Sequence, residues 1–284
     1  MASNPRKAAI QWLRAKLPPE ASRARHVAAA ALTMAQYAAA RARALPIAPS
    51  VSQAAVWLDH VQRQGYCTVP DFYTARSCEL AVRELERVFA QYPAYVQRKS
   101  DQRVFGVEAA SPLLREFACH PRLLAVAQAV LREPTLNAFT LGARIDSRAG
   151  NAGSGEGWHR DSFVVQFKAI LYLCDVTEST GPLQLIVDSE KPWRLARDIV
   201  EGRLGLAQNR VSDAQVERLL EPDPRRLCTF TAKAGTLLLV NTSAIHRGKP
   251  IELGTRHALT NYYVQARQAG PAMDAHFAPV LRRA

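Results

Sequence analysis

The segment Gly157-Trp158-His159-Arg160-Asp161 decides how this chain is interpreted, because it contains a histidine followed two residues later by a carboxylate. In a β-strand, residues i and i+2 point to the same side, so His159 and Asp161 could bind one ion from one strand end. None of the other six histidines has an acidic residue two positions on. A pattern this short arises by chance in roughly half of chains with so many histidines, so the surrounding sequence must support it.

The sequence on both sides of this segment supports a metal site. A glycine-rich loop at residues 146–157 precedes it and lets the backbone approach closely. A second histidine, His246, follows an apolar run at residues 236–240 that is typical of a buried strand. Two histidines and one carboxylate on one face of an ion leave its other positions open, as in non-haem iron(II) oxygenases. The sequence therefore predicts His159, Asp161 and His246 as metal ligands.

Arg256 is the next candidate, because it lies ten residues after His246, past a glycine-containing turn and at the start of the next expected strand. A hairpin of this length would return the chain beside its own start. Arginine offers a planar fork that binds a carboxylate through two hydrogen bonds. A 2-oxoglutarate that chelates iron through its keto-acid end needs such a partner for its distal carboxylate. Alone, each histidine could be an ordinary core or surface residue and Arg256 a solvated strand residue, so the combination carries the prediction.

Helical patterns come first along the chain and strand patterns follow. Helices are expected at residues 5–17, 21–44, 52–64, 74–91 and 112–131, the last of them broken at Pro121. Strands are expected at residues 66–69, 136–145, 162–173, 183–187, 227–231, 236–240 and 258–264. This order predicts an α+β fold with a β-sandwich or barrel-like catalytic unit. The long connection at residues 188–226, with a capping box from Ser212 to Gln215, is a candidate lid.

The positive charge is concentrated at the amino end. The formal net charge is +12, and residues 1–45 hold eight Lys or Arg against one acid, which gives this segment +7. We expect a basic helical N-terminal extension at residues 1–45 and a catalytic domain at residues 46–284. A helix that carries Ile10, Trp12, Leu13 and Leu17 could lie on an anionic membrane surface. The alternative is that both N-terminal helices pack on the outside of the domain with their arginines in solvent.

Cysteine usage and hydropathy bear on the compartment. The five cysteines are odd in number and form no CxxC pair, which argues against a disulfide framework and a structural zinc site and favours a reducing compartment. No stretch reaches the roughly 20 apolar residues that a spanning helix needs. The N-terminus does not match a signal peptide either. We expect a cytoplasmic protein, with peripheral contact to the inner face of the membrane as the role of the basic extension.

The ordered set of motifs between Gly65 and Val264 resembles the phytanoyl-CoA dioxygenase-like family of iron(II)/2-oxoglutarate oxygenases. The resemblance implies a double-stranded β-helix, or jelly roll, with N-terminal and flanking helices. It also implies iron(II), 2-oxoglutarate and O2 as cofactors and cosubstrates, and hydroxylation of an unactivated C–H bond with release of succinate and CO2. The motifs that carry it are Gly65-Tyr66-Cys67-Thr68-Val69-Pro70-Asp71-Phe72, Gly157-Trp158-His159-Arg160-Asp161, the run from Leu171 to Leu183 and the run from Gly235 to Gly248.

The chain departs from the family pattern near the expected cosubstrate. Many members carry serine two residues after the distal histidine and again two residues after the arginine, whereas this chain has Gly248 and Ala258. Another residue must then help to hold 2-oxoglutarate. Lys168 and Tyr172 are the candidates, because they share one strand face with Ile170 and a charge in a half-buried strand needs a partner. The alternative for Lys168 is a strand-end lysine whose ammonium reaches solvent.

Two other functions remain open from the sequence. One is a cupin-like metal enzyme, such as an isomerase, which would use similar ligands without 2-oxoglutarate and would not need Arg256. The other is a non-catalytic module whose basic arm recruits an anionic partner. A nucleic-acid partner is not expected, because the chain has no zinc finger and no strands that interleave aromatic and basic residues. The substrate class stays open between a small metabolite, a natural product and a glycan or glycolipid. Asp161 occupies the position that halogenating relatives free for chloride, so we expect hydroxylation or desaturation.

Overall fold

The computed structural model describes residues 23–42, 52–205 and 207–282 of the chain. The α-helices are α2 (Arg23–Arg41), α3 (Ser52–Gln64), α4 (Ala75–Gln91), α5 (Pro112–Ala118), α6 (Pro121–Leu131), α7 (Pro192–Glu201), α8 (Asp213–Leu220) and α9 (Pro271–Phe277). The strands are β1 (Tyr66–Val69), β2 (Gln97–Arg98), β3 (Gln102–Phe105), β4 (Thr135–Asp146), β5 (Phe167–Tyr172), β6 (Leu183–Ile186), β7 (Leu227–Phe230), β8 (Leu237–Asn241), β9 (His246–Gly248) and β10 (Thr255–Gln265). Short single-turn helices are η1 (Pro93–Tyr95), η2 (Val107–Ala109), η3 (Pro224–Arg226) and η4 (Ala266–Gln268).

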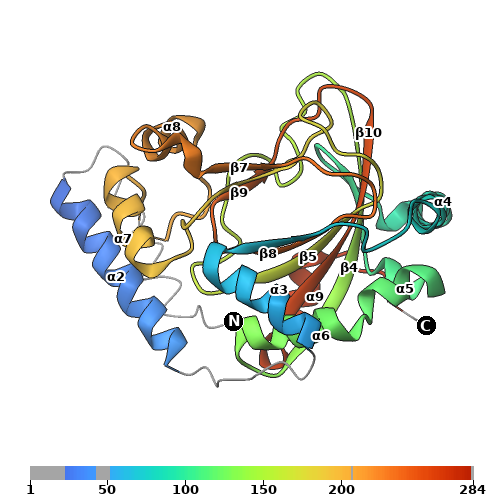
Figure 1. Cartoon of the computed structure of the whole chain (residues 1–284), viewed down its shortest axis with the longest axis horizontal. Coiled ribbons are helices and arrows are strands. Elements are labelled where there is room, and N and C mark those ends of the chain that lie inside the picture. Colours follow the sequence, from blue (N-terminus) through green and yellow to red (C-terminus); the bar gives the residue numbers. More distant parts are fainter. Residues whose placement is uncertain (1–22, 43–51, 206, 283–284) are drawn as a thin grey trace.

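Two antiparallel sheets face each other at the centre of the molecule. The large sheet has the strand order β1-β8-β5-β10-β4-β3-β2, and the small sheet has the order β7-β6-β9. From β5 onward the chain passes repeatedly between them, since β5, β8 and β10 belong to the large sheet and β6, β7 and β9 to the small one. In Figure 1 the small sheet lies above the large sheet, whose lower side is covered by α3, α5 and α6. This is the double-stranded β-helix, which confirms the expected α+β fold.

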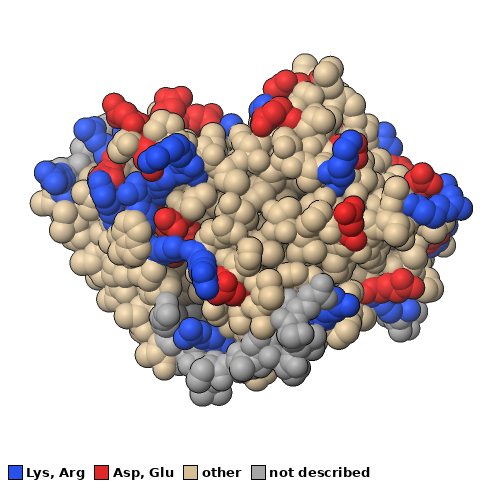
Figure 2. Space-filling model, in the orientation of Figure 1, with Lys and Arg blue, Asp and Glu red and all other residues tan. Residues whose placement is uncertain are grey.

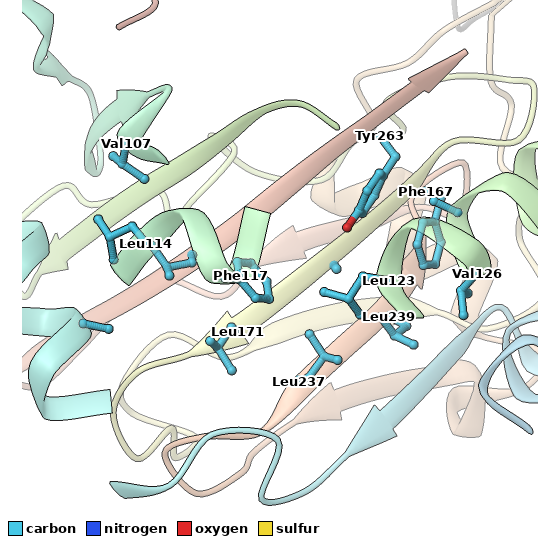
Figure 3. Packing of buried hydrophobic residues seen from close by; sticks show 14 of the residues in the cluster. Val107, Leu114, Phe117, Leu123, Val126, Phe167, Leu171, Leu237, Leu239 and Tyr263 are labelled. Atoms are coloured by element: carbon cyan, nitrogen blue, oxygen red, sulfur yellow. The ribbon is translucent and has the colours of Figure 1, made fainter. Parts of the chain in front are cut away.

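The alternation of side chains along β5 explains how the large sheet serves both a core and a site. Phe167, Ala169 and Leu171 are fully buried in the main hydrophobic cluster, together with residues of α5 and α6. Figure 3 shows Phe167 and Leu171 near Phe117 and Leu123 of these helices. Each such large apolar side chain stabilises the fold by roughly 1.5–3 kcal/mol. Because successive strand residues alternate in direction, Lys168, Ile170 and Tyr172 face the small sheet instead.

Most predicted elements are present, and their ends follow local chemistry. Pro121 begins a new helix after α5 has ended, because proline suits the first turn and cannot continue a helix. The capping box between Ser212 and Gln215 begins α8 as predicted. The strand expected at residues 162–173 becomes regular only at Phe167. The short strands β2, β3 and β9 were not predicted, and α7 lies in a connection for which only α8 was predicted in detail.

The predicted hairpin between His246 and Arg256 is wrong. β9 pairs with β6 in the small sheet, whereas β10 pairs with β4 and β5 in the large sheet. The connection therefore crosses from one sheet to the other and does not fold back on its own start. Arg256 still lines the same cavity as His159, Asp161 and His246, but it belongs to the large sheet, whereas His246 belongs to the small one.

The helix α2 packs on the connection between β6 and β7. Its buried residues form one stripe, and they are His26, Ala29, Ala30, Thr33 and Tyr37. Ala29 and Ala30 share a hydrophobic cluster with Leu195 and Ile199 of α7, and His26 Nδ1 hydrogen-bonds to the carbonyl of Leu204 at 3.1 Å. The helix expected at residues 5–17 lies outside the described residues. Among the helices that the structure describes, none is long and apolar enough to cross a membrane.

Candidate metal centre

The structure brings His159, Asp161 and His246 together on one backbone framework. The amides of His159 and His246 each donate to the other residue's carbonyl, at 2.9 and 2.8 Å, which forms an isolated antiparallel β-bridge. The amide of Asp161 donates to the Thr242 carbonyl at 3.0 Å. The segment that carries the HxD motif thus runs beside the segment that carries the distal histidine. It is this bridge, and not the end of a regular strand, that aligns His159 with Asp161.

The three side chains present their ligand atoms to one point. One ligand atom from each residue lies within 4.8 Å of the other two. His159 Nε2 is 3.8 Å from Asp161 Oδ1, and His246 Nε2 is 3.9 Å from Asp161 Oδ2. These separations suit donor atoms that surround a single ion on one face. The rings of the two histidines lie side by side, with their centroids 4.3 Å apart.

Hydrogen bonds fix which nitrogen of each imidazole is free. His159 Nδ1 is 2.9 Å from the Gly157 carbonyl, and His246 Nδ1 is 2.9 Å from the Ala244 carbonyl. A carbonyl only accepts, so each Nδ1 carries a proton and each Nε2 keeps its lone pair for an ion. Burial, and then the neighbouring His246, lowers the pKa of His159 to about 3. Burial also lowers the pKa of His246, so both imidazoles are neutral as metal ligation requires.

The glycine-rich loop packs directly on the first histidine, as the sequence predicted. Gly155 has φ +87°, and a Cβ at this position would overlap the His159 ring. Gly248 on β9 lies against Ser154 of the same loop, where an added Cβ would be 2.9 Å from the Ser154 Cβ. The space that a serine at position 248 would need is therefore already filled. The loop explains why this chain departs from the family pattern there.

Lys168 reaches the metal centre but contacts a ligand residue. Its Nζ is 2.7 Å from Asp161 Oδ2 and 4.2 Å from the centroid of the Tyr262 ring. Only 8% of Lys168 is exposed, so its ammonium does not extend to solvent as the alternative interpretation would have it. Burial alone would raise the pKa of Asp161, but Lys168 and the two histidines outweigh it and hold that pKa below its usual range. The ion pair keeps the carboxylate charged and oriented.

Arg256 and Tyr172 line the same cavity as the metal ligands. Arg256 is 6% exposed, and its Nη1 donates to the Gly181 carbonyl. Its Nε is buried and has no hydrogen-bond partner among the described residues. The Tyr172 hydroxyl accepts from the Leu183 amide at 2.9 Å and donates to the Phe230 carbonyl at 3.3 Å, so it is already satisfied. A buried arginine with a free N–H is suited to a carboxylate from solution.

The cavity around these residues has a volume of about 640 Å³. Its wall on the large sheet is formed by the inward-facing residues of β4, β5 and β10. The sequence did not predict Phe105, Phe139 or Phe277 as lining residues, because aromatic residues in strands usually indicate core. Of the candidate lid at residues 188–226, Asn209 and Arg210 line the cavity. Its helices α7 and α8 instead belong to the cluster that includes α2.

Comparison with known proteins agrees with this geometry. The family model described as phytanoyl-CoA dioxygenase matches residues 61–257. No curated protein matches the chain. Among solved structures, the epimerase SnoN from nogalamycin biosynthesis, in complex with Fe3+, alpha ketoglutarate and nogalamycin RO, is 16% identical, with 76% of this chain and 84% of that chain covered and a TM-score of 0.57.

Two further solved structures share the fold. HygX from Streptomyces hygroscopicus, with nickel and 2-oxoglutarate bound, is 18% identical, with 74% of this chain and 87% of that chain covered and a TM-score of 0.54. EctD from S. alaskensis, in its apoform, is 16% identical, with 77% of this chain and 78% of that chain covered and a TM-score of 0.58. At these identities the likeness establishes the jelly-roll architecture of the chain.

Proposed function

The chain belongs to the phytanoyl-CoA dioxygenase family, and from this membership we propose that it is an iron(II)- and 2-oxoglutarate-dependent oxygenase acting on a small organic molecule. His159, Asp161 and His246 would hold the iron, and Arg256 would bind the distal carboxylate of 2-oxoglutarate. The observation that carries the proposal is the convergence of two neutral imidazoles and one carboxylate in a cavity that Arg256, whose buried Nε has no hydrogen-bond partner among the described residues, also lines.

The donor set suits the proposed metal and cosubstrate. Two imidazole nitrogens and one carboxylate are the ligands of iron(II) oxygenases that keep positions open for a cosubstrate and O2. When bound, these groups supply the oxidation of an unactivated C–H bond, with succinate and CO2 as the products of 2-oxoglutarate. The protein's part is to hold the ligands in one protonation state, to fix both ends of the cosubstrate, and to enclose the reacting bond.

Each protein group has a separate task in this scheme. The carbonyls of Gly157 and Ala244 keep both Nε2 atoms free of protons. Lys168 holds the second oxygen of Asp161, which favours binding through the other oxygen alone. Tyr172 forms the wall beside Arg256, and its hydroxyl ties that wall to β6 and β7. The apolar inward residues of β4 and β10 exclude water from the reacting centre.

We propose hydroxylation as the outcome, since Asp161 is present as a third protein ligand. Related structures carry other outcomes, because SnoN is described as an epimerase and SnoK from the same pathway as a carbocyclase. The alternative is a cupin-like metal enzyme that does not use 2-oxoglutarate. It would not explain why the buried Nε of Arg256 lacks a hydrogen-bond partner among the described residues. Small molecules are the bound partners in two related structures, nogalamycin RO with SnoN and hygromycin B with HygX.

The test is an anaerobic titration of the purified protein with iron(II) and 2-oxoglutarate, followed by exposure to O2. Formation of the iron–2-oxoglutarate charge-transfer absorption, and succinate release that needs both iron and 2-oxoglutarate, would support the proposal. Metal binding with no response to 2-oxoglutarate would favour the cupin-like enzyme. Absence of metal binding would favour a non-catalytic module. A metabolite extract that stimulates succinate release would then lead to the substrate.

A further inference from the structure

The cavity extends well beyond the metal centre, across the inner face of the large sheet. Its lining residues alternate along each strand, and cross-strand pairs place Tyr262 beside Phe139 on one side and Lys168 on the other. Arg256 and Tyr172, on β10 and β5, mark the side proposed for 2-oxoglutarate. The part of the cavity that is lined by β3, β4, the later residues of β10 and α9 therefore remains for the substrate.

An aromatic cluster forms the floor of this second side. Phe105, Phe139, Tyr262 and Phe277 all line the cavity. The ring centroids of Phe139 are 5.1 Å from Phe105, 4.9 Å from Tyr262 and 4.9 Å from Phe277. Phe277 belongs to α9, so this helix contributes to the same side of the cavity. Such a floor favours an apolar or ring-containing body of the substrate.

The side chains that line the cavity carry a strong excess of positive charge. Within the described part of the chain, its lining includes six Lys or Arg side chains, and Asp161 is the one acidic residue. Iron(II) and the dianion of 2-oxoglutarate cancel each other formally, so loading the site leaves this excess unchanged. Four of the six cations already have a role. Lys168 pairs with Asp161 and Arg103 pairs with Asp101 outside the lining. The buried Arg160 donates to the carbonyls of Ser189 and Ser243, and Arg256 is the residue proposed for the cosubstrate.

Arg210 lies beside the candidate metal centre and contributes to the positive charge of the cavity. Its backbone forms an isolated β-bridge with His159, which fixes its position relative to a metal ligand. Its Nη1 donates to the carbonyls of Gly155 and Glu156, and no described acid forms a salt bridge with it. Lys99, in the turn between β2 and β3, also lines the cavity without a salt bridge to a described acid. Arg210 and Lys99 thus line the cavity together with the aromatic cluster, and neither forms a salt bridge with a described acid.

We infer that the substrate of the proposed oxygenase carries an anionic group, a carboxylate or a phosphate, that Arg210 binds with help from Lys99 while its apolar body lies against Tyr262 and Phe277, which the buried Phe105 and Phe139 support. Arg210 is then a specificity-determining residue contributed by the connection at residues 188–226. Its guanidinium offers the planar donor fork that suits either oxyanion. The inference rests on the proposed function, because it assigns the other side of the cavity to 2-oxoglutarate.

The test uses four probes with one aromatic body, namely cinnamate, cinnamyl phosphate, cinnamamide and cinnamylamine. Their binding to the full-length protein loaded with Mn(II) and 2-oxoglutarate is measured by calorimetry. We expect both anions to bind about tenfold more tightly than the amide or the amine, which corresponds to about 1.4 kcal/mol for the charge-assisted hydrogen bonds to Arg210. The tighter of the two anions identifies the carboxylate or the phosphate as the natural group.

Single substitutions test separately the binding of the anionic group and the binding of the aromatic body of the probe. Arg210→Gln should remove most of the preference for the anions, and Lys99→Gln should reduce it to a smaller extent. Phe277→Ala should weaken all four probes by a similar factor. Lys233→Gln is the matched control, because Lys233 is 85% exposed, is paired with Asp175 and does not line the cavity.

The inference is overturned if the amide or amine binds as tightly as the anions, or if Arg210→Gln keeps the preference intact. It is also overturned if none of the four probes binds saturably at millimolar concentration. Binding of Mn(II) and 2-oxoglutarate is titrated first, in the absence of any probe. Failure of that titration counts against the proposed function alone, since the preference among the four probes and its loss in Arg210→Gln can still be measured in the unloaded protein.

Discussion

The three proposed ligand side chains present their donor atoms to one point, so replacing any one of them should have the same effect. His159→Ala, Asp161→Ala and His246→Ala should each abolish tight binding of one Mn(II) per chain, measured by electron paramagnetic resonance. Three protein ligands are the smallest set in this type of site, and losing one leaves too few. Circular dichroism should show an intact fold. Unchanged metal binding in any of the three would mean that the residue is not a ligand.

Arg256 should act on the cosubstrate and not on the metal. Arg256→Met removes the charged fork with its free buried Nε, which should cost about 2–3 kcal/mol, or a roughly 30- to 150-fold loss in 2-oxoglutarate affinity. Calorimetry on the Mn(II)-loaded protein measures this loss, and Mn(II) affinity itself should stay the same. Arg225→Met is the control, since the Arg225 side chain is 89% exposed. An unaltered affinity for 2-oxoglutarate would assign its distal carboxylate to another residue.

Lys168 should behave as a positioning residue for Asp161, because its ammonium is 2.7 Å from that carboxylate. Lys168→Met should weaken Mn(II) binding by about 10- to 100-fold, the usual effect of losing a partner that orients a metal ligand. Lys168→Arg should restore part of the affinity, which a merely structural role would not explain. The opposite pattern, normal metal binding with weakened 2-oxoglutarate binding, would show that Lys168 contacts the cosubstrate, as the sequence alone suggested.

Among structural elements, the loop between β4 and β5 has the most direct effect on the site. Gly155 and Gly150 both have positive φ, +87° and +75°, but a Cβ would overlap the His159 ring only at Gly155. Gly155→Ala should therefore displace His159 and weaken Mn(II) binding, whereas Gly150→Ala should show only the cost of backbone strain, about 1–2 kcal/mol in thermal unfolding. Equal metal affinities in the two variants would contradict the contact with His159.

The same elements show what a sequence can and cannot predict. Runs such as β8 and β10 were predicted because burial on one or both faces leaves a clear apolar pattern. β3 is four residues long and begins with Gln102 and Arg103, so it carries no such pattern. His159, Asp161 and His246 could be predicted from spacing and residue type. The ion pair between Lys168 and Asp161 could not, because it depends on how the segment before β5 bends toward the large sheet.

Arg256 shows another limit of prediction from the sequence. Its residue type and its distance from His246 suggested a residue of the same cavity, where the structure places it, while the hairpin used to justify this was wrong. Sequence separation alone does not say whether a chain folds back or crosses to a second sheet. The aromatic cluster at Phe105, Phe139 and Phe277 was missed for a related reason. Three distant segments supply it, and each one alone is indistinguishable from ordinary core.

Within the described residues, the packing of α2 on α7 links the N-terminal helix to the connection that reaches the cavity. α2 covers α7, and the connection that contains α7 also supplies Asn209 and Arg210 to the cavity. Figure 2 shows Lys and Arg side chains gathered on the part of this face that α2 and α7 occupy in Figure 1. The sequence analysis offered the alternative that the N-terminal helices pack on the domain with their arginines in solvent. For α2, the buried apolar stripe and the basic surface beside it agree with that alternative.

Removing residues 1–45 should therefore destabilise the protein and loosen the connection at residues 188–226. Without α2, Leu195, Ile199 and Leu204 lose part of their cover, and uncovering one such side chain costs about 1.5–3 kcal/mol, or roughly 3–12 °C in Tm. Hydrogen exchange should increase in α7 and α8, while Mn(II) binding through His159, Asp161 and His246 persists. Thermal unfolding and hydrogen exchange of the truncated protein measure both effects.

A shorter deletion, of residues 1–22, is the matched control, because it removes four of the eight basic residues and keeps α2. It should leave Tm and hydrogen exchange unchanged. Sedimentation with vesicles then separates the two interpretations of the basic region, since a surface helix binds anionic lipid through charge and loses that binding as salt increases. If the full-length protein sediments with anionic but not neutral vesicles, and the 1–22 deletion abolishes this without loss of stability, the first segment is a membrane arm. If both kinds of vesicle are ignored and only the longer deletion destabilises the fold, the N-terminal region acts through α2 as a support for the cavity mouth.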